Sequence, residues 1–288
     1  MSARPIDPLP QLLIEGAVKA ALLEDLGRAG DITTEATVPA NAEAMVVMRA
    51  RQAGTIAGLD AARTAFRLVD AGLRCAVQKP DGSDVQPGDT IMAIEGKARS
   101  ILTGERVALN FLGHLSGIAT TTRAMVRAVE GTGARICCTR KTTPNLRAFE
   151  KYAVRCGGGA NHRFGLDDGV LIKDNHIAAA GGITAAIKSA RAHIGHMVKI
   201  EIEVDTLQQL SEALEAGAEV IMLDNMGPAE LKEAVALTGG RAVLEASGRV
   251  TLESVRAIAE SGVDIISAGW ITHSAPCLDI GLDYETAL

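Results

Sequence analysis

The chain has 288 residues, 47% of them hydrophobic and 22% charged, and its formal net charge at pH 7 is −6. This length allows one large α/β domain or two of modest size. The acidic balance and an aromatic content of only 2% argue against a nucleic-acid-binding protein, because such proteins present cationic surfaces and aromatic stacking platforms.

The cysteines and the apolar segments predict a reduced, cytoplasmic protein. The five cysteines are odd in number and include no CxxC pair, so neither a disulfide framework nor a zinc site is expected. The apolar stretch near the N-terminus is interrupted by Glu15 and Lys19, and we recognise no signal peptide in it. No apolar run is long enough to span a bilayer, so we expect no membrane partner.

The first hundred residues predict a mixed α and β unit. Leucine and alanine recur at helical spacing from Leu9 to Leu23, and the pattern stops at Gly27. Residues 80–98 carry the Asp-Gly and Pro-Gly pairs of a hairpin. We expect strands at 43–50, 54–59 and 73–79, a helix at about 60–71, and a long helix at 99–130 that bridges two domains.

From Gly133 onward, short apolar segments alternate with amphipathic helices that end in glycine. Strands separated by single helices pair in parallel through right-handed crossovers. The later repeat of some twenty residues is that of a β/α barrel, but six strands, or seven if another flanks the long helix, do not complete one. We therefore expect an incomplete barrel. Its strands are expected at 134–139, 169–174, 198–204, 218–224, 241–247 and 263–269.

Polar residues follow each of these strands, at the end where β/α barrels place their active sites. Five basic residues, at two consecutive strand ends and in the Gly-rich loop that joins them, suit carboxylates or phosphates, because Arg pairs with two oxygens at once and Lys supplies a point charge. They are Arg140, Lys141, His162, Arg163 and Lys173.

Two carboxylates, Glu203 and Asp224, end neighbouring strands and suit a divalent cation or a sugar hydroxyl. Mg²⁺ fits such a sparse site when substrate phosphates supply its remaining ligands. Glu201 precedes Glu203 on the same strand, and we expect the two side chains to face opposite ways. Only one of them would then face the barrel mouth.

The last two strands end in small residues that suit a phosphate. Barrel enzymes commonly bind a phosphate at this place through backbone N–H groups and a helix N-terminus. The segments are Ser247-Gly248 and Ser267-Ala268-Gly269.

The basic residues belong to a segment, 135–176, whose charge opposes that of the whole chain. It holds eight basic residues against four acidic ones, beside a glycine run. A local reversal of this kind is typical of a site for a small, highly charged anion. Arg147 and Lys151 follow helical spacing and are interpreted as scaffold, whereas Arg155 is left open.

Several motifs follow one another along the chain: EDLGRAGDITT at 24–34, GERVALN at 104–110, TRKTTPNLR at 139–147, KYAVRCGGGANHRFGLDDGVLIKDNH at 151–176, then IEIEVD, VIMLDNM, LEASGRV and ISAGWITHS. In these motifs and their order the chain resembles the quinolinate phosphoribosyltransferase family. The resemblance covers nearly the whole chain, and its glycine-rich run is highly specific. One departure is Asn145, where family members often have Gly, and we expect it to change a loop without loss of activity.

This resemblance implies an α/β fold with two domains, like other type II phosphoribosyltransferases. Residues 1–112 would form an N-terminal α/β sandwich that residues 273–288 complete, and residues 113–272 an incomplete β/α barrel. It also implies a homodimer in which Arg106 reaches the active site of the neighbouring subunit. Nothing in the local pattern around Arg106 indicates such a role.

The implied reaction transfers phosphoribosyl from phosphoribosyl pyrophosphate to quinolinate with decarboxylation, a step of NAD biosynthesis. Lys141, Lys173, Glu203 and Asp224 would be catalytic, and Mg²⁺ would meet Glu203 and Asp224 directly or through the substrate. The implied substrate-binding residues are Arg106, Thr139, Arg140, Lys141, His162, Arg163, Lys173, Glu203, Asp224, Ser247, Gly248, Arg249, Ser267, Ala268 and Gly269.

Two alternative functions remain open from the residues alone. A Schiff-base barrel aldolase would use Lys173 as its nucleophile, but it would make little use of the other basic residues and of the late phosphate loops. A non-catalytic relative that only binds an oxyanion would have no use for Glu203 and Asp224.

Overall fold

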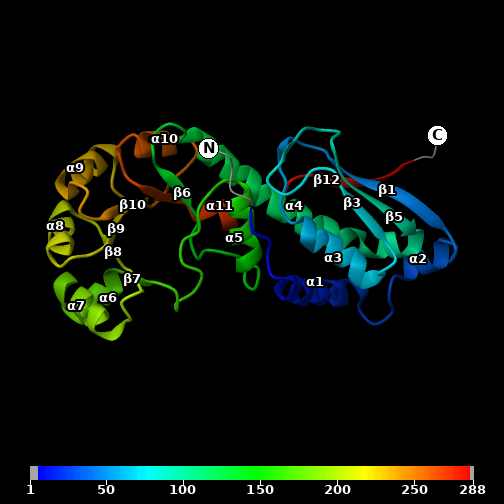
Figure 1. Cartoon of the computed structure of the whole chain (residues 1–288), viewed down its shortest axis with the longest axis horizontal. Helices are drawn as coiled ribbons and strands as arrows, with labels where there is room; N and C mark the ends of the chain where they lie inside the picture. The colour runs from blue at the N-terminus through cyan, green and yellow to red at the C-terminus, as the bar shows by residue number, and fades with distance from the viewer. Residues whose placement is uncertain (1–5, 286–288) are drawn as a thin grey trace. The chain divides into compact units, whose positions relative to one another are not determined.

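The computed structural model describes residues 6–285, which divide into two compact units (Figure 1). The described part of the first unit comprises 6–123, 143–158 and 274–285, and the second comprises 124–142 and 159–273. The long helix α4 (Ala98–Ala128) passes from one unit into the other, so the domain boundary expected after residue 112 falls inside a helix. Within 6–285, none of the helices is both long and apolar enough to cross a membrane.

A four-stranded antiparallel sheet in the order β12-β1-β5-β3 forms one layer of the first unit. Strand β12 (Ile280–Tyr284), from the far end of the chain, pairs with β1 (Glu43–Ala50), which pairs on its other side with β5 (Thr90–Lys97). Strand β3 (Arg74–Val77) forms the other edge. The remaining strands, β2 (Gly54–Thr55) and β4 (Asp84–Val85), pair only with each other.

Helices make the second layer of this unit. Helix α1 (Gln11–Leu26) ends at Gly27 as predicted, and it lies beside α3 (Leu59–Val69) in Figure 1. The strand expected at 54–59 is shorter than predicted, because the chain turns at Gly58, with φ +103°, into α3. The unit also contains α2 (Ile32–Thr37) and α5 (Arg147–Cys156).

The second unit confirms the expected α/β class with an incomplete barrel. Its six described strands are all parallel, in the order β6-β11-β10-β9-β8-β7, and those at the two edges, β6 and β7, do not pair with each other. The strands are β6 (Arg135–Cys137), β7 (Val170–Ile172), β8 (Ile200–Val204), β9 (Val220–Asp224), β10 (Val243–Ser247) and β11 (Ile265–Ser267). The helices between and after them are α6 (Asp174–Ala180), α7 (Ile183–His193), α8 (Leu207–Glu215), α9 (Pro228–Thr238), α10 (Val255–Ala259) and α11 (Trp270–His273).

Apolar side chains cover one face of this sheet, whereas the two glutamates of β8 point to the other face. Ile202 and Val204 on β8 and Leu223 on β9 are each 0% exposed. Burial of such a side chain contributes about 1.5–3 kcal/mol relative to leaving it in water. The parallel strands all end at one edge of the sheet, and this edge carries the candidate site.

Candidate active site

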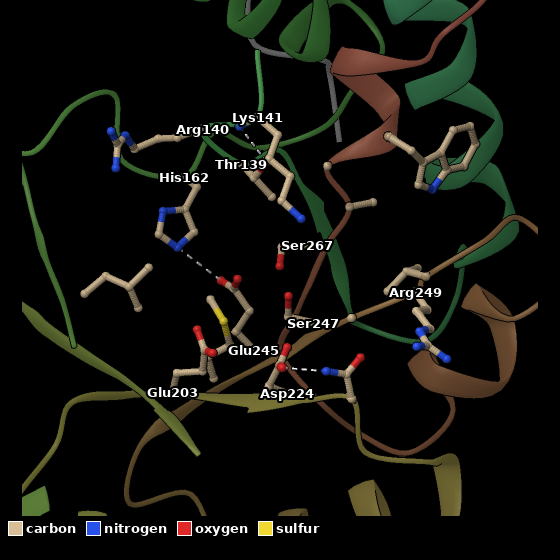
Figure 2. A pocket seen from close by; sticks show the side chains of 18 of the residues that line it. Thr139, Arg140, Lys141, His162, Glu203, Asp224, Glu245, Ser247, Arg249 and Ser267 are labelled. Atoms are coloured by element: carbon tan, nitrogen blue, oxygen red, sulfur yellow. Dashed lines mark hydrogen bonds and ion pairs between the residues drawn. The ribbon is translucent and has the colours of Figure 1, made fainter. Parts of the chain in front are cut away.

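A cavity of about 710 Å³ lies at the carboxyl ends of the barrel strands, entirely within the second unit (Figure 2). It brings together all of the predicted site residues except Arg106. Arg106 is exposed on α4 in the first unit and lines a different cavity there. The predicted residues around the site cavity are Thr139, Arg140, Lys141, His162, Arg163, Lys173, Glu203, Asp224, Ser247, Gly248, Arg249, Ser267, Ala268 and Gly269.

Lys141 follows β6, and its amine is directed into the cavity (Figure 2). Its backbone N–H donates to the Thr139 hydroxyl at 3.0 Å, and its carbonyl accepts from the Thr272 hydroxyl at 2.8 Å. A Cβ atom at position 269 would lie 2.8 Å from the Lys141 Cδ atom. Gly269 therefore leaves the space through which the lysine side chain reaches the cavity.

Two guanidinium groups in the cavity each have a buried N–H donor without a hydrogen-bond acceptor in the described chain. The Nε atoms of Arg140 and Arg163 are both buried, and neither has a hydrogen-bond partner within the described chain. Arg163 makes one bond through Nη1, to the Gly169 carbonyl at 2.9 Å. Burial lowers the pKa of Arg163, and the positive charge of Arg140 lowers it further. Since buried donors are normally satisfied, this wall suits a small anion.

The opposite wall of the cavity carries carboxylates, with Glu203 at the end of β8 and Asp224 at the end of β9 (Figure 2). Glu203 forms an ion pair with Lys173, with 2.7 Å between Oε2 and Nζ. Burial raises the pKa of Asp224, and the charges of Glu203 and Asp205 raise it further. This crowding of negative charge suits a cation, and carboxylate oxygens are ligands that Mg²⁺ accepts.

The last two strands end in the loops expected to meet a phosphate, and both loops line the cavity. The backbone groups of these two loops are not equivalent. The Ala268 N–H donates to the Cys137 carbonyl at 3.0 Å, so it is already used between β11 and β6. Arg249, after β10, adopts a left-handed conformation with φ +48°.

His162 uses both of its ring nitrogens inside the protein. Nδ1 accepts the Arg163 backbone N–H at 2.8 Å, so it carries no proton. The proton therefore lies on Nε2, which faces the Glu201 carboxylate at 2.9 Å and the Glu245 carboxylate at 3.7 Å. Three possible metal ligands meet here, but a protonated Nε2 cannot bind a metal, and we interpret the cluster as a hydrogen-bonded support for His162.

The expectation that Glu201 and Glu203 face opposite ways is wrong. Residues two apart on a strand point to the same face, and both of these contact residues that line the cavity. Glu201 lies deeper, with 7% of its surface exposed. Glu245 on β10 was not singled out from the sequence, although a charged residue within the apolar run VLEAS is a signal of a buried polar role.

The carboxyl of Glu245 should make the second unit less stable as the pH rises. Burial, followed by the charge of Glu201, raises its pKa from 4.5 to about 7, so the folded chain keeps a proton that the unfolded chain has lost. The resulting stabilisation is complete below the unfolded pKa and is lost as the pH rises through the folded one, by about 1.4 kcal/mol for each pH unit between the two pKa values. Glu245→Gln should therefore gain stability relative to the wild type between about pH 5 and about pH 8.

Denaturant unfolding followed by Trp270 fluorescence measures this effect, because Trp270 is the single tryptophan and lies in the second unit. Glu233→Gln, at an exposed position of α9, is the matched control and should show no such gain. If the stability of the wild type and of Glu245→Gln changed equally with pH, the raised pKa would not belong to Glu245.

Comparisons with known proteins show the family of the chain. Residues 31–116 match the family model of the quinolinate phosphoribosyl transferase N-terminal domain, and residues 118–283 match that of its C-terminal domain. The chain is 48% identical to the probable nicotinate-nucleotide pyrophosphorylase [carboxylating] of Bacillus subtilis, over 91% of this chain and 90% of the relative. It is 45% identical to the nicotinate-nucleotide pyrophosphorylase [carboxylating] of Mycobacterium leprae, over 92% and 95% of the two chains.

Solved structures show the same likeness across both units. NadC from Streptococcus pyogenes superposes with a TM-score of 0.93 at 43% identity, covering 97% of this chain and 100% of that one. The nicotinate-nucleotide pyrophosphorylase from Francisella tularensis superposes with a TM-score of 0.93 at 36% identity, covering 98% and 99%. The motifs and the whole-chain fold therefore point to the same family.

Proposed function

The chain belongs to the quinolinate phosphoribosyltransferase family, and on that premise we propose that it converts quinolinate and phosphoribosyl pyrophosphate into nicotinate mononucleotide, pyrophosphate and CO₂. The proposal rests on the two opposite walls of one cavity. The cationic wall consists of Arg140, Lys141 and Arg163, and the acidic wall consists of Glu203 and Asp224. One substrate is a dicarboxylate, and the other joins a sugar to a phosphate and a diphosphate. The cationic wall suits the carboxylates and phosphates of these substrates, and the acidic wall suits the ribose hydroxyls and a cation bound with the diphosphate.

The cationic wall is proposed to bind quinolinate. Its two carboxylates would accept from Arg140 and Arg163, whose buried Nε–H groups have no acceptor within the described chain. Charged hydrogen bonds of this kind are stronger than neutral ones, and the guanidinium fork fixes the plane of the ligand. Lys141 would add a further positive charge beside them.

The acidic wall is proposed to meet the ribose. Glu203 and Asp224 would bind its hydroxyls and hold Mg²⁺, directly or through the substrate, and the loops 247–249 and 267–269 would hold the 5′-phosphate. The raised pKa of Asp224 fits this role, since a cation there would offset the repulsion from Glu203 and Asp205. Mg²⁺ held by these carboxylates or by the substrate would neutralise charge that develops on the departing pyrophosphate.

The residues of the cavity suit a reaction that proceeds by positioning and charge stabilisation. Pyrophosphate leaves C1 of the ribose, and positive character on the sugar is stabilised by the carboxylates of Glu203 and Asp224. The pyridine nitrogen of quinolinate, held by Arg140 and Arg163, then attacks C1. The resulting cationic ring stabilises the electron pair left on C2 as CO₂ departs, and C2 then takes up a proton from solvent to give nicotinate mononucleotide.

Schiff-base chemistry at Lys173 has no support. An amine that attacks a carbonyl needs a free nitrogen, whereas the Lys173 Nζ atom is engaged in an ion pair with a Glu203 oxygen 2.7 Å away. In the proposed reaction Lys173 is a cation that orients Glu203 and faces the pyrophosphate.

We also propose that two chains share each active site through Arg106. Arg106 is exposed and does not line the cavity of its own chain, while the family resemblance assigns it to the site of the neighbouring subunit. A sedimentation mass equal to a single chain of 30.0 kDa under assay conditions would contradict this arrangement.

The proposed function is tested with purified protein, quinolinate, phosphoribosyl pyrophosphate and Mg²⁺. We expect CO₂ and pyrophosphate to be released in equal amounts. Turnover with nicotinate in place of quinolinate, and none with quinolinate, would move the chain to a different phosphoribosyltransferase activity. Trapping of a substrate on Lys173 with borohydride would instead restore the aldolase interpretation.

A further inference from the structure

We infer that Asn225 is a positioning residue for the ribose-phosphate half of the site, because it links the Asp224 carboxylate to the loop at Gly248. This inference rests on the proposed function, in which Asp224 and the loop 247–249 receive phosphoribosyl pyrophosphate. Asn225 lines the cavity, but the proposed reaction gives it no step of its own. Three features of its surroundings support the positioning role.

The backbone of Asn225 is held in an unusual conformation. Its φ angle is +54°, in the left-handed region that non-glycine residues seldom adopt, although asparagine tolerates it better than most. The Asn225 N–H donates to the Ser247 carbonyl at 2.9 Å, so the ends of β9 and β10 are joined at this point. Among the described non-glycine residues, only Asn145, Asn225 and Arg249 have a positive φ, and two of these three line the cavity.

The side chain of Asn225 holds one oxygen of Asp224. Its Nδ2 atom donates to Asp224 Oδ2 at 2.6 Å, drawn as the dashed line at Asp224 in Figure 2. Because a carboxylate only accepts hydrogen bonds, the NH₂ group must face Asp224, and the amide oxygen must face the other way. One carboxylate oxygen is thereby fixed, which sets the direction of the other.

The opposite end of the Asn225 amide lies against Gly248. A Cβ atom built at position 248 would come within 2.3 Å of Asn225 Oδ1 and 2.8 Å of Asn225 Cγ. Gly248 also has φ +97°, which a side chain would strain. The loop 247–249 therefore rests directly on the amide that orients Asp224, and Asn225 fixes the positions of both.

This arrangement predicts which substrate depends on Asn225. Its contacts reach Asp224, Ser247 and Gly248, all in the half of the cavity assigned to phosphoribosyl pyrophosphate, and none involves Arg140 or Arg163. Loss of the amide should therefore weaken the use of phosphoribosyl pyrophosphate and leave the binding of quinolinate unchanged. A residue that merely stabilised the fold would affect the two substrates alike.

The test compares Asn225→Gly, which keeps the left-handed backbone without strain, with Asn225→Asp, which keeps the shape but replaces the donor with a negative charge. We expect kcat/KM for phosphoribosyl pyrophosphate to fall about 10- to 100-fold in Asn225→Gly and further in Asn225→Asp. The dissociation constant of quinolinate, followed by Trp270 fluorescence, should stay within about twofold. Asn145→Gly makes the same replacement at the other left-handed asparagine, which is exposed and outside the cavity, and should leave both constants unchanged.

A second measurement tests the contact with Gly248 without any need for turnover. Gly248→Ala should lower the melting temperature more in the wild-type background than in Asn225→Gly. Only the wild type retains the side-chain amide that meets the new methyl group, whereas the contact with the backbone nitrogen of residue 225, at 2.9 Å, stays in both. Additive melting shifts, or equal losses for the two substrates in Asn225→Gly, would overturn the inference. Absence of turnover in the wild type would instead refute the proposed function, and the melting comparison would still decide the role of Asn225.

Discussion

Arg163→Ala should lower kcat/KM for quinolinate by about 100-fold or more, while the chain stays folded. Each hydrogen bond to a charged group contributes about 1.5–3 kcal/mol, and a guanidinium paired with a carboxylate makes two of them. The surroundings strengthen this effect, because Arg163 is partly desolvated and lies close enough to Arg140 for the two cations to repel each other. Within the described chain, its guanidinium makes one hydrogen bond, to the Gly169 carbonyl, so little structural support is lost.

Two further variants test whether the charge of Arg163 or the shape of its guanidinium matters: Arg163→Lys in the cavity and, as a control outside it, Arg191→Ala. The lysine variant keeps the positive charge but loses the planar fork, so we expect a loss between those of Arg163→Ala and the wild type. Arg191 also donates to a glycine carbonyl, that of Gly217 at 2.7 Å, but lies outside the cavity, so Arg191→Ala should change kcat/KM less than about twofold. Steady-state kinetics measure kcat/KM for each variant, and circular dichroism checks that each variant is folded. Near-normal turnover in Arg163→Ala would show that the cationic wall does not bind quinolinate.

The site residues on strand ends were predictable because of how parallel strands are arranged. The carboxyl ends of parallel strands meet at one edge, so residues as far apart in the chain as Arg140 and Asp224 were expected in one place, and both line the cavity. The pairing of β12 with β1 is different in kind. Residues 280–284 carry no pattern that indicates a partner more than 200 positions earlier, and only the family resemblance implied it.

Some features of the site could not be predicted from the sequence, because they depend on the position of one backbone group or one proton. The tautomer of His162 depends on the direction of the Arg163 N–H, and the contact between Asn225 and Gly248 depends on two left-handed residues meeting. Glu245 was missed because a glutamate in a buried strand looks like a packing exception until its distance to His162 is known. Each of these features depends on a contact between residues that are close only in the folded chain, and the spacing of residues along the sequence does not indicate such contacts.

Asp224→Asn should lower kcat/KM for phosphoribosyl pyrophosphate by about 100- to 1,000-fold and raise the Mg²⁺ concentration needed for half-maximal activity. The amide keeps the shape of the side chain but loses the charge that would stabilise the ribose cation and attract the metal. Asp205→Asn is the matched control, because Asp205 repels Asp224 electrostatically but does not line the cavity. It removes the same charge nearby and should change kcat/KM less than about threefold.

Removing Mg²⁺ with EDTA should abolish turnover in the wild type, and titrating it back separates the two variants. Asp205→Asn should follow the wild-type Mg²⁺ curve, whereas Asp224→Asn should need more metal and still not recover full activity. Quinolinate binding should survive in both, because the cationic wall comes from other segments: Arg140 follows β6, and Arg163 lies in the loop before β7. If Asp224→Asn kept the wild-type Mg²⁺ response, Asp224 would not hold the metal, and the acidic wall would have to act on the ribose hydroxyls alone.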